Sequence, residues 1–269
     1  MDLQLTGKKA VVTGASAGIG KAVTWSLARE GVDVAICARN KEPLEASAAE
    51  ISRATNRQIV PIVADLTKPA DAENFISKAH AALGRIDILV NNAGSSPGGV
   101  IEHLSEEEWA SSLQLKFMGY VRCMKHALPI MQKQGKGRVV NVIGNDGVKV
   151  SYWEIAPGAA NAAGQNLTLS LASQYGKDNI SFVCVNPGPV RTERWTGLVK
   201  AMARDMNISY EEADKLAPAS IPLGRIAESE EVANLVTYLA SDLAHFINGT
   251  MIEIDGGQDK PLMDKIRDR

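Results

Sequence analysis

Short apolar runs alternate with longer amphipathic segments along the whole chain, and this alternation restricts the possible folds more than any other feature. Several of the short runs are apolar throughout, as expected for strands that helices cover on both faces. Strands alternating with helices predict an α/β fold with a parallel, doubly wound sheet. About seven strands are expected, in the segments KAVVTGA, DVAICAR, IVPIVADL, IDILVNNAG, GRVVNVIG, ISFVCVNPG and GTMIEIDGG.

The intervening segments have the spacing of apolar residues that is typical of helices. The first helix is expected to stop at Gly31, a suitable C-terminal cap. A single long helix is expected from Glu106 to Gln134, opened by Ser105 with Glu108 three residues later, which is the pattern of a capping box. The last long helix is expected from Pro157 to Tyr175.

No repeat, low-complexity linker or break in composition divides the 269 residues, so we expect one domain. Within it, a long insertion around residues 191–222 is expected to form a substrate lid. Residues 259–269 form a charged tail that is expected to lie at the surface or to face a partner.

The overall charge and composition argue against several classes of partner. A net charge of −2 gives no indication of nucleic acid or an anionic membrane as partner. No apolar run approaches the roughly 18 residues that span a bilayer, and the N-terminus lacks a signal-peptide pattern. Three widely spaced cysteines fit neither a disulfide framework nor a metal site, so we expect no metal and three buried thiols. A cytoplasmic location is expected.

The segment TGASAGIG joins the first strand to the first helix. Gly14, Gly18 and Gly20 would allow a tight turn and a close approach of the backbone to a pyrophosphate. The helix that follows offers free N–H groups and a positive dipole end to that anion. A glycine-rich loop alone is weak evidence, but its place between a strand and a helix predicts a dinucleotide site.

Further motifs agree with this one. The glycine spacing occurs with NNAG (Asn91 to Gly94), with Asp65 in ADL, with NPGPVRT and with DGG, and in this combination the chain resembles the short-chain dehydrogenase/reductase family. The resemblance runs from about Leu5 to Gln258. It implies a Rossmann-type fold, binding of NAD or NADP, and assembly into homodimers or homotetramers.

The resemblance also implies which residues bind the cofactor. Asp65 would bond the adenine edge, Asn92 to Gly94 would line the adenosine ribose, and Pro187 to Thr192 would flank the nicotinamide. The full expected set is Gly14, Ser16, Gly18, Ile19, Gly20, Arg39, Asp65, Leu66, Asn92, Ala93, Gly94, Pro187, Gly188, Val190 and Thr192.

The end of the second strand favours NADP(H) over NAD(H), although NAD(H) stays possible. An acidic residue there would bond the ribose 2′-hydroxyl and repel a 2′-phosphate. This chain has Ala38 at that position, followed by Arg39, whose guanidinium suits a phosphate in charge and geometry. The alternative is that Arg39 is a solvated surface charge.

The resemblance implies a tyrosine that supplies a proton, a lysine four residues later that lowers the tyrosine's pKa, and a serine that polarises the carbonyl. An asparagine on the preceding helix would hold the lysine. Here all four positions differ: Gly144 stands for the serine, Pro157 for the tyrosine, Asn161 for the lysine and Lys116 for the asparagine. Proline and glycine have no side-chain donor.

Lys116 and Asn161 look like an exchange of cation and amide between two helices. A lysine on the earlier helix could place its ammonium in roughly the same space, and Tyr152 on the covering loop could then form a substitute acid pair with Lys116. The candidate catalytic residues are therefore Tyr152, Lys116 and Asn161.

Each of these residues has a plainer interpretation. Tyr152 with Trp153 would form an apolar lid, and Lys116 would be a structural ion-pair partner. Asn145 and Asp146 are nearby donors or acceptors, although Asp146 before Gly147 also suits a turn.

These features favour an NADP(H)-preferring oxidoreductase that interconverts a carbonyl and an alcohol on a small molecule, with an unorthodox active site. Loss of four proton-handling positions keeps two alternatives open: a nucleotide-binding sensor or partner subunit, and a non-redox lyase. In the lid, apolar residues at helical spacing either line a substrate cavity or pack on the core. They are Trp195, Leu198, Val199, Met202 and Met206.

Overall fold

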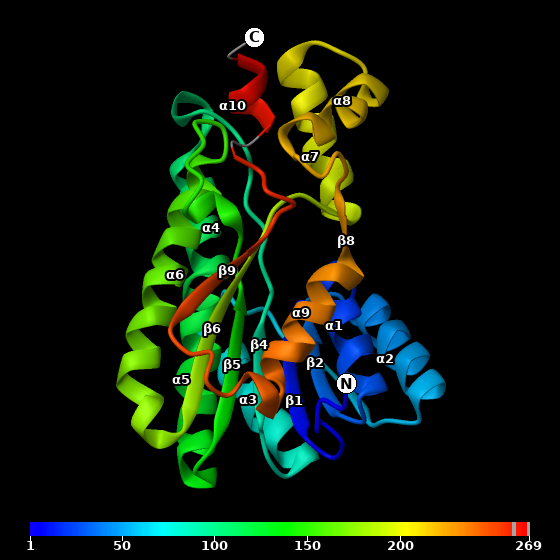
Figure 1. Cartoon of the computed structure of the whole chain (residues 1–269), viewed down its shortest axis with the longest axis vertical. Coiled ribbons are helices and arrows are strands. Elements are labelled where there is room, and N and C mark those ends of the chain that lie inside the picture. Colours follow the sequence, from blue (N-terminus) through cyan, green and yellow to red (C-terminus); the bar gives the residue numbers. More distant parts are fainter. Residues whose placement is uncertain (260–261, 268–269) are drawn as a thin grey trace.

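The computed structural model describes residues 1–259 and 262–267, and its centre is a seven-stranded sheet. All neighbouring strands pair in parallel in the order β3-β2-β1-β4-β5-β6-β9, which confirms the predicted doubly wound α/β fold (Figure 1). The strands are β1 (Lys9–Thr13), β2 (Asp33–Ala38), β3 (Ile59–Val63), β4 (Ile88–Asn91), β5 (Gly137–Val142), β6 (Ile180–Pro187) and β9 (Thr250–Ile254).

Strand order reverses between β1 and β4. The chain leaves β1 toward β2 on one side and leaves β4 toward β5 on the other, while Val11 pairs with Leu89 between them. In sheets of this kind a crevice opens beyond the carboxyl ends of the two strands at the reversal. Thr13 and Asn91, the last residues of β1 and β4, therefore mark the place for a ligand.

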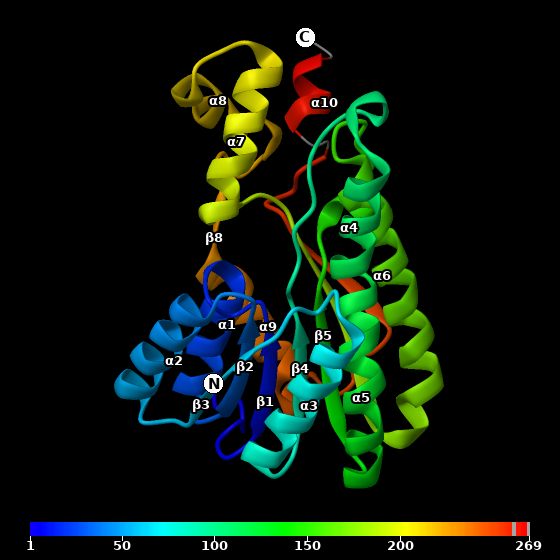
Figure 2. The ribbon, with the colours of Figure 1, turned by 180° about the vertical axis from the view of Figure 1, so that it is seen from behind.

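Helices cover both faces of the sheet, as Figures 1 and 2 show from opposite sides. One layer packs on the first face: α1 (Gly18–Arg29), α2 (Lys41–Thr55) and α9 (Ser229–Ala240). The other layer contains α3 (Pro69–Leu83), α4 (Glu106–Lys116), α5 (Met118–Gln134) and α6 (Ile155–Tyr175).

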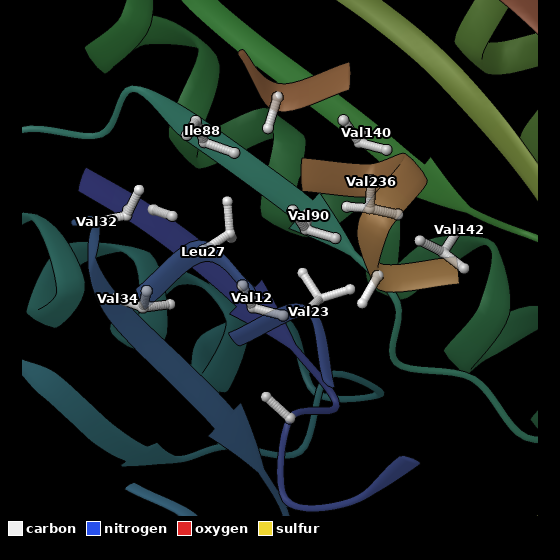
Figure 3. Close-up of a cluster of buried hydrophobic side chains, with 14 of the residues drawn as sticks. Val12, Val23, Leu27, Val32, Val34, Ile88, Val90, Val140, Val142 and Val236 are labelled. Carbon is white, nitrogen blue, oxygen red and sulfur yellow. The ribbon is translucent and has the colours of Figure 1, made fainter. Parts of the chain in front are cut away.

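Alternate residues of each strand feed the two layers. Val12 and Val90 belong to the cluster under α1 and α9, whereas Val11 and Leu89 belong to the cluster under α3 and α5. Figure 3 shows the first cluster, in which side chains of α1 and α9 meet those of the strands. The labelled members are Val12, Val23, Leu27, Val32, Val34, Ile88, Val90, Val140, Val142 and Val236. The three cysteines are free and buried, as expected.

The expected single helix from Glu106 to Gln134 is wrong, because it divides at Phe117 into α4 and α5. Phe117 has φ −107° and ψ −63°, and the Arg122 guanidinium donates to the Gln114 carbonyl at the break. The capping box of Ser105 and Glu108 is present at the start of α4. The division leaves Lys116 as the last residue of α4.

Beyond the carboxyl ends of the strands lies a smaller cluster. It contains α7 (Glu193–Met206), α8 (Tyr210–Leu216) and α10 (Leu262–Arg267), which stand together above the sheet (Figure 1). A second, two-stranded sheet of β7 (Val190–Arg191) and β8 (Ala227–Glu228) leads into and out of it. The short 3₁₀ segments are η1 (Ile101–His103), η2 (Asn145–Gly147), η3 (Gly176–Asp178), η4 (Ala217–Ser220) and η5 (Asp242–Ala244).

Met263 of α10 differs from the expectation that the C-terminal tail lies at the surface or faces a partner. Met263 is buried in the cluster with Trp153 and Trp195. Asp264 accepts hydrogen bonds from the Ser151 hydroxyl and the Tyr152 N–H, so α10 is tied to the segment before α6. Residues 260, 261, 268 and 269 of that tail lie outside the described residues. Among the described helices none is long and apolar enough to cross a membrane.

Candidate active site

A cavity of about 610 Å³ lies between the glycine-rich loop after β1, the carboxyl ends of β4, β5 and β6, and the cluster of α7 and α10. It therefore occupies the crevice that the strand order predicts. One end is lined by the loop residues Gly14 and Gly18, and the other by Trp195 and Met263.

The glycine-rich loop has no room for side chains at two of its three glycines. A Cβ on Gly14 would lie 2.8 Å from the Ala93 Cα, and a Cβ on Gly20 would lie 2.2 Å from the Gly14 carbonyl oxygen. Gly14 also has φ +67°, which glycine adopts without strain. The loop is thus a bare backbone cradle, which is what a pyrophosphate requires.

The NNAG segment holds this loop in place. The Thr13 hydroxyl accepts hydrogen bonds from the N–H groups of Asn92 and Ala93, at 2.9 and 3.0 Å. The Asn92 side-chain amide donates to the carbonyls of Thr13 and Gly14. The Asn92 side chain therefore clamps the loop against the end of β4.

The N-terminus of α1 is open for an anion. Its N-cap residue is Ala17, which makes no side-chain cap, and the first turn contains no acidic residue. The first N–H groups of a helix have no partners within the helix and carry the positive end of its dipole. A phosphate group at this place would satisfy them.

Most of the residues expected to bind the cofactor line this cavity. They are Gly14, Ser16, Gly18, Ile19, Arg39, Leu66, Asn92, Ala93, Gly94, Pro187, Gly188, Val190 and Thr192. Gly20 lies behind the loop instead. The Asp65 carboxylate accepts hydrogen bonds from the N–H and hydroxyl of Thr67, and although burial opposes its ionisation, these bonds hold the pKa of Asp65 below its usual value.

Lys116 lines the cavity, although the residue is only 6% exposed. Its carbon stem packs on Gly94, where a Cβ would be 3.1 Å from the Lys116 Cγ. Among residues 1–259 and 262–267 the ammonium has no hydrogen bond and no ion pair, so the structural ion-pair interpretation finds no partner there. Burial lowers the pKa of Lys116 to about 8, although the Asp146 carboxylate opposes this.

The segment η2 lies tightly on the first turns of α6. The Asn161 amide donates to the Asp146 carboxylate at 2.5 Å, and the Gln165 amide donates to the Gly144 carbonyl at 3.0 Å. The side-chain oxygen of Asn161, Oδ1, is buried and has no hydrogen-bond partner among the described residues. Asp146 lines the cavity, whereas Asn161 holds it from behind. Asp146 is therefore more than a turn residue.

Gly144 has a backbone that excludes a serine. Its φ is +148° and ψ is 149°, a conformation essentially confined to glycine. A Cβ there would lie 2.6 Å from the Asn161 amide nitrogen and 2.7 Å from an Asp146 carboxylate oxygen. The loop conformation at this position therefore requires the glycine that stands where the resemblance implies a serine.

A polar network ties η2 to the end of β9 and to the segment after α8. Asn145 donates to Asp255 at 3.1 Å and to Gln258 at 2.8 Å, and Gln258 donates to Ser220. Lys149 forms an ion pair with Asp255 at 2.5 Å. Burial alone would raise the pKa of Asp255, but Lys149 and Asn145 hold this pKa below its usual value. The network connects the cavity wall to Ser220 of η4.

Tyr152 has a different setting from Lys116. Its hydroxyl donates to the Met263 carbonyl at 3.2 Å, and its N–H donates to Asp264. In the described part of the chain Tyr152 is not among the residues that line the cavity, whereas its neighbour Trp153 is. Lys116, Asp146 and Gly144 therefore line the same cavity, whereas the Tyr152 hydroxyl is bonded to Met263 of α10.

Three charged residues of the cavity were missed by the sequence reasoning. They are Glu154, at the start of α6, and Glu193 and Arg194, in the first turn of α7. Glu154 stands three residues before Pro157, so a search for any titratable group within one helical turn of the missing tyrosine would have found it. Arg194 offered no comparable signal, because only the tertiary fold turns α7 over the cavity.

The cluster around α7 supplies an apolar wall. Leu198 and Met202 of α7 line the cavity together with Trp153, Trp195 and Met263. Val199 is fully buried in the same cluster, so the apolar face of α7 both packs on its neighbours and contributes to the wall. The two tryptophans are fixed at their indole nitrogens, by Asp205 and Asp214 respectively.

Comparisons with known proteins agree with this architecture. The family model described as short chain dehydrogenase matches residues 8–203. The 3-oxoacyl-[acyl-carrier-protein] reductase FabG of Thermotoga maritima is 31% identical over 255 residues, covering 95% of this chain and 99% of the relative. The NADPH-dependent reductase BacG of Bacillus subtilis is 28% identical over 266 residues, covering 96% and 100%.

Among solved structures, the L-sorbose reductase of Gluconobacter frateurii, complexed with NADPH and L-sorbose, superimposes with a TM-score of 0.91 at 29% identity. The alignment covers 97% of this chain and 99% of that one. The glycine cradle, the clamp of Asn92 on it and the matched sequence together show that the chain belongs to the short chain dehydrogenase family.

Proposed function

We propose that this protein is an NADP(H)-dependent oxidoreductase that interconverts a carbonyl and an alcohol on a small molecule. The observation that carries the proposal is the buried Lys116 ammonium, which faces the cavity without an ionic partner among the described residues. A buried charge without a partner is costly and persists where function requires it. Its place beside Gly94 puts it between the cofactor cradle and the lid.

The residues of the cradle fit a dinucleotide cofactor, which when bound would supply a hydride. The uncapped N-terminus of α1 and the bare backbone at Gly14 suit a pyrophosphate. Arg39 lines the same end of the cavity and makes no hydrogen bond or ion pair within the described chain. Its guanidinium suits a 2′-phosphate, and both BacG and the sorbose reductase are described with NADPH.

Lys116 would act where negative charge develops on the substrate oxygen. A fixed positive charge in a dry site stabilises such an oxyanion far more than it would in water. Asp146 and Asn161 would hold the opposite side of the site, because their mutual hydrogen bond fixes the carboxylate. Asn161 would thus be a positioning residue rather than one that contacts the substrate.

The role of Tyr152 as proton donor remains a prediction. Its hydroxyl is engaged with the Met263 carbonyl, so a donor role requires that bond to break. The kcat of the Tyr152→Phe variant tests whether Tyr152 donates the proton. A loss of roughly 100-fold in kcat is expected if Tyr152 supplies the proton, whereas unchanged kcat would remove it from the mechanism.

The substrate is expected to combine a carbonyl or hydroxyl group with apolar bulk. The cavity is lined both by charged side chains, among them Lys116 and Asp146, and by the apolar side chains of Trp153, Trp195 and Met202. Residues 191–222 would act as the lid, since they carry most of the apolar wall.

A second candidate function is a nucleotide-binding sensor without turnover. The absence of side-chain donors at Gly144 and Pro157 favours it. It does not account for Lys116, because a sensor gains nothing from an unpaired ammonium facing the substrate end of the cavity. Tight NADPH binding with no oxidation across a broad carbonyl panel would favour the sensor.

The proposal is tested with purified protein in two steps. Binding of NADPH and NADH is measured by nucleotide fluorescence, and carbonyl compounds are then screened for oxidation of the bound cofactor. Arg39→Ala is expected to weaken NADPH binding by roughly 10-fold or more, as for loss of charge-assisted hydrogen bonds, and to leave NADH binding nearly unchanged. Arg53→Ala, an exposed arginine on α2, is the matched control. Absence of nucleotide binding would defeat the proposal.

A further inference from the structure

The reduction of a carbonyl needs a proton as well as a hydride, and the cavity lacks the usual hydroxyl donor. Gly144 and Pro157 have no donor side chain. The Tyr120 hydroxyl lines the cavity, but it donates to the Val142 carbonyl at 2.7 Å, and burial raises its pKa far above the usual value. The other titratable groups that line the cavity, Glu154 among them, are therefore candidates for the proton donor.

Glu154 is held in place by its backbone on three sides. Its N–H donates to the Ser151 hydroxyl at 3.2 Å, and its carbonyl accepts from Gly158 at 2.8 Å. A bridge to Gly99 pairs it with the loop after β4. The start of α6 is therefore fixed, and so is the direction from which the Glu154 side chain enters the cavity.

The Glu154 side chain serves no structural purpose that the described residues show. It stands at the N-cap position of α6 but makes no capping hydrogen bond. It has no ion pair with Lys116 or Arg194, and none within residues 1–259 and 262–267. The Glu154 carboxyl thus lines the cavity and is influenced by two cations, but it is paired with neither.

Four charged groups face Glu154, each from a different element. Asp146 lies on η2, Lys116 on α4, Arg194 on α7 and Asp264 on α10. Burial, with the two carboxylates, raises the pKa of Glu154 to about 8 against the opposing effect of the two cations. At neutral pH the side chain is therefore a neutral carboxylic acid with a proton to give.

We propose that the Glu154 carboxyl donates the proton to the substrate oxygen during carbonyl reduction and takes it back during alcohol oxidation. As a hydride supplied by the reduced nicotinamide cofactor adds to the carbonyl carbon, the carbonyl π bond becomes a lone pair on oxygen, and the Glu154 O–H proton passes to that oxygen. Glu154 is left as a carboxylate beside Lys116 and Arg194, and it regains its proton from solvent. This role rests on the proposed oxidoreductase function.

The first experiment observes the carboxyl group directly, without turnover. Infrared difference spectra of the protein without cofactor are recorded below and above about pH 8. The wild type is expected to lose the carbonyl stretch of a protonated carboxyl with a midpoint near pH 8, and Glu154→Gln is expected to lack this band. Lys116→Met is expected to move the midpoint upward, because it removes a cation that favours the carboxylate. Absence of a band that depends on Glu154 would overturn the proposal.

The second experiment measures turnover. Glu154→Gln is expected to lower kcat by roughly 100-fold or more, as for loss of a general acid, with NADPH affinity unchanged as evidence of a folded site. Glu154→Asp keeps the acid but shortens it, so an intermediate kcat is expected. The matched control is Glu102→Gln, which replaces a carboxylate with a carboxamide at an exposed position on η1.

The outcomes separate this role from the function on which it rests. Wild-type turnover with Glu154→Gln equally active would overturn the role of Glu154 and leave the oxidoreductase function standing. A wild type that binds NADPH but reduces no carbonyl would defeat the function, and the role of Glu154 with it.

Discussion

At the scale of single residues, the candidate site replaces one hydroxyl donor with a set of charged side chains. Lys116 and Glu154 each have a pKa of about 8, one lowered and one raised by burial. Groups with a pKa near the working pH transfer protons most effectively. An ammonium and a carboxyl can thus manage the charge that a tyrosine and lysine handle in related enzymes.

Burial of the Lys116 ammonium is expected to cost stability. Lowering its pKa from 10.5 to about 8 corresponds to roughly 3 kcal/mol. Because the folded-state pKa lies below the unfolded one, the cost is fully present below about pH 8 and is lost as pH rises toward 10.5. Lys116→Met is expected to raise the free energy of unfolding by about 1–3 kcal/mol at neutral pH while lowering kcat.

Urea unfolding of wild type and Lys116→Met at several pH values checks this prediction. The gain should shrink as the pH increases above about 8. A substitution that destabilises the protein at neutral pH would show that the ammonium has a compensating partner.

Reinstalling a serine at Gly144 is expected to fail structurally. The backbone there has φ +148°, and a Cβ would collide with Asn161 and Asp146. Gly144→Ser should reduce the free energy of unfolding by about 1–3 kcal/mol without raising turnover. Denaturant unfolding and kcat measure both effects, and Gly135→Ser, at φ +70° with open space around its Cβ position, is the control for backbone strain alone.

At the scale of elements, the site depends on a short helix far along the chain. Met263 of α10 lines the cavity, and Asp264 holds the segment that contains Ser151 and Tyr152. The lid and the start of α6 are thus fixed by the last described helix.

Ending the chain at Gln258 is expected to separate cofactor binding from turnover. The cradle of α1 and β4 makes no contact with α10 in the interactions above, so NADPH affinity should stay within about 3-fold of the wild-type value. In contrast, kcat/KM should fall by roughly 10-fold or more, because the residues at the substrate end of the cavity are no longer held in place. Asp264→Ala is a milder variant that keeps α10. Equal loss of NADPH affinity and kcat/KM would show that α10 supports the whole fold rather than the lid.

At the scale of the whole molecule, the strand order places the cofactor cradle where β1 and β4 diverge. The two helix layers leave the outer face of α6 exposed. That face presents small residues at Ala159, Ala162, Asn166 and Ser170. Small side chains allow two helices to approach closely, so this face suits the homodimer or homotetramer that the family resemblance implies.

Ala162→Arg is expected to reduce the assembly size, because a long charged side chain would prevent close packing of α6 against its copy. Size-exclusion chromatography with light scattering measures the mass. Ala49→Arg, an exposed alanine on α2, should leave the mass unchanged. A monomeric wild type would contradict the predicted assembly.

The order of strands and helices along the chain and the glycine cradle at Gly14 could be predicted from the sequence, because they depend on local patterns. The clamp of Asn92 on that cradle could not, because it joins residues 79 positions apart. The loss of donors at Gly144 and Pro157 could also be predicted, because it is a matter of residue type alone.

Only the tertiary structure decided which charges face one another. Met263 binds the Tyr152 hydroxyl from 111 residues away, and α7 carries Arg194 over the cavity. At the division at Phe117, a guanidinium from the next helix donates to a carbonyl of α4. Burial and electrostatic neighbours set the protonation of Lys116 and Glu154, and these arise from packing between distant segments, which no local pattern encodes.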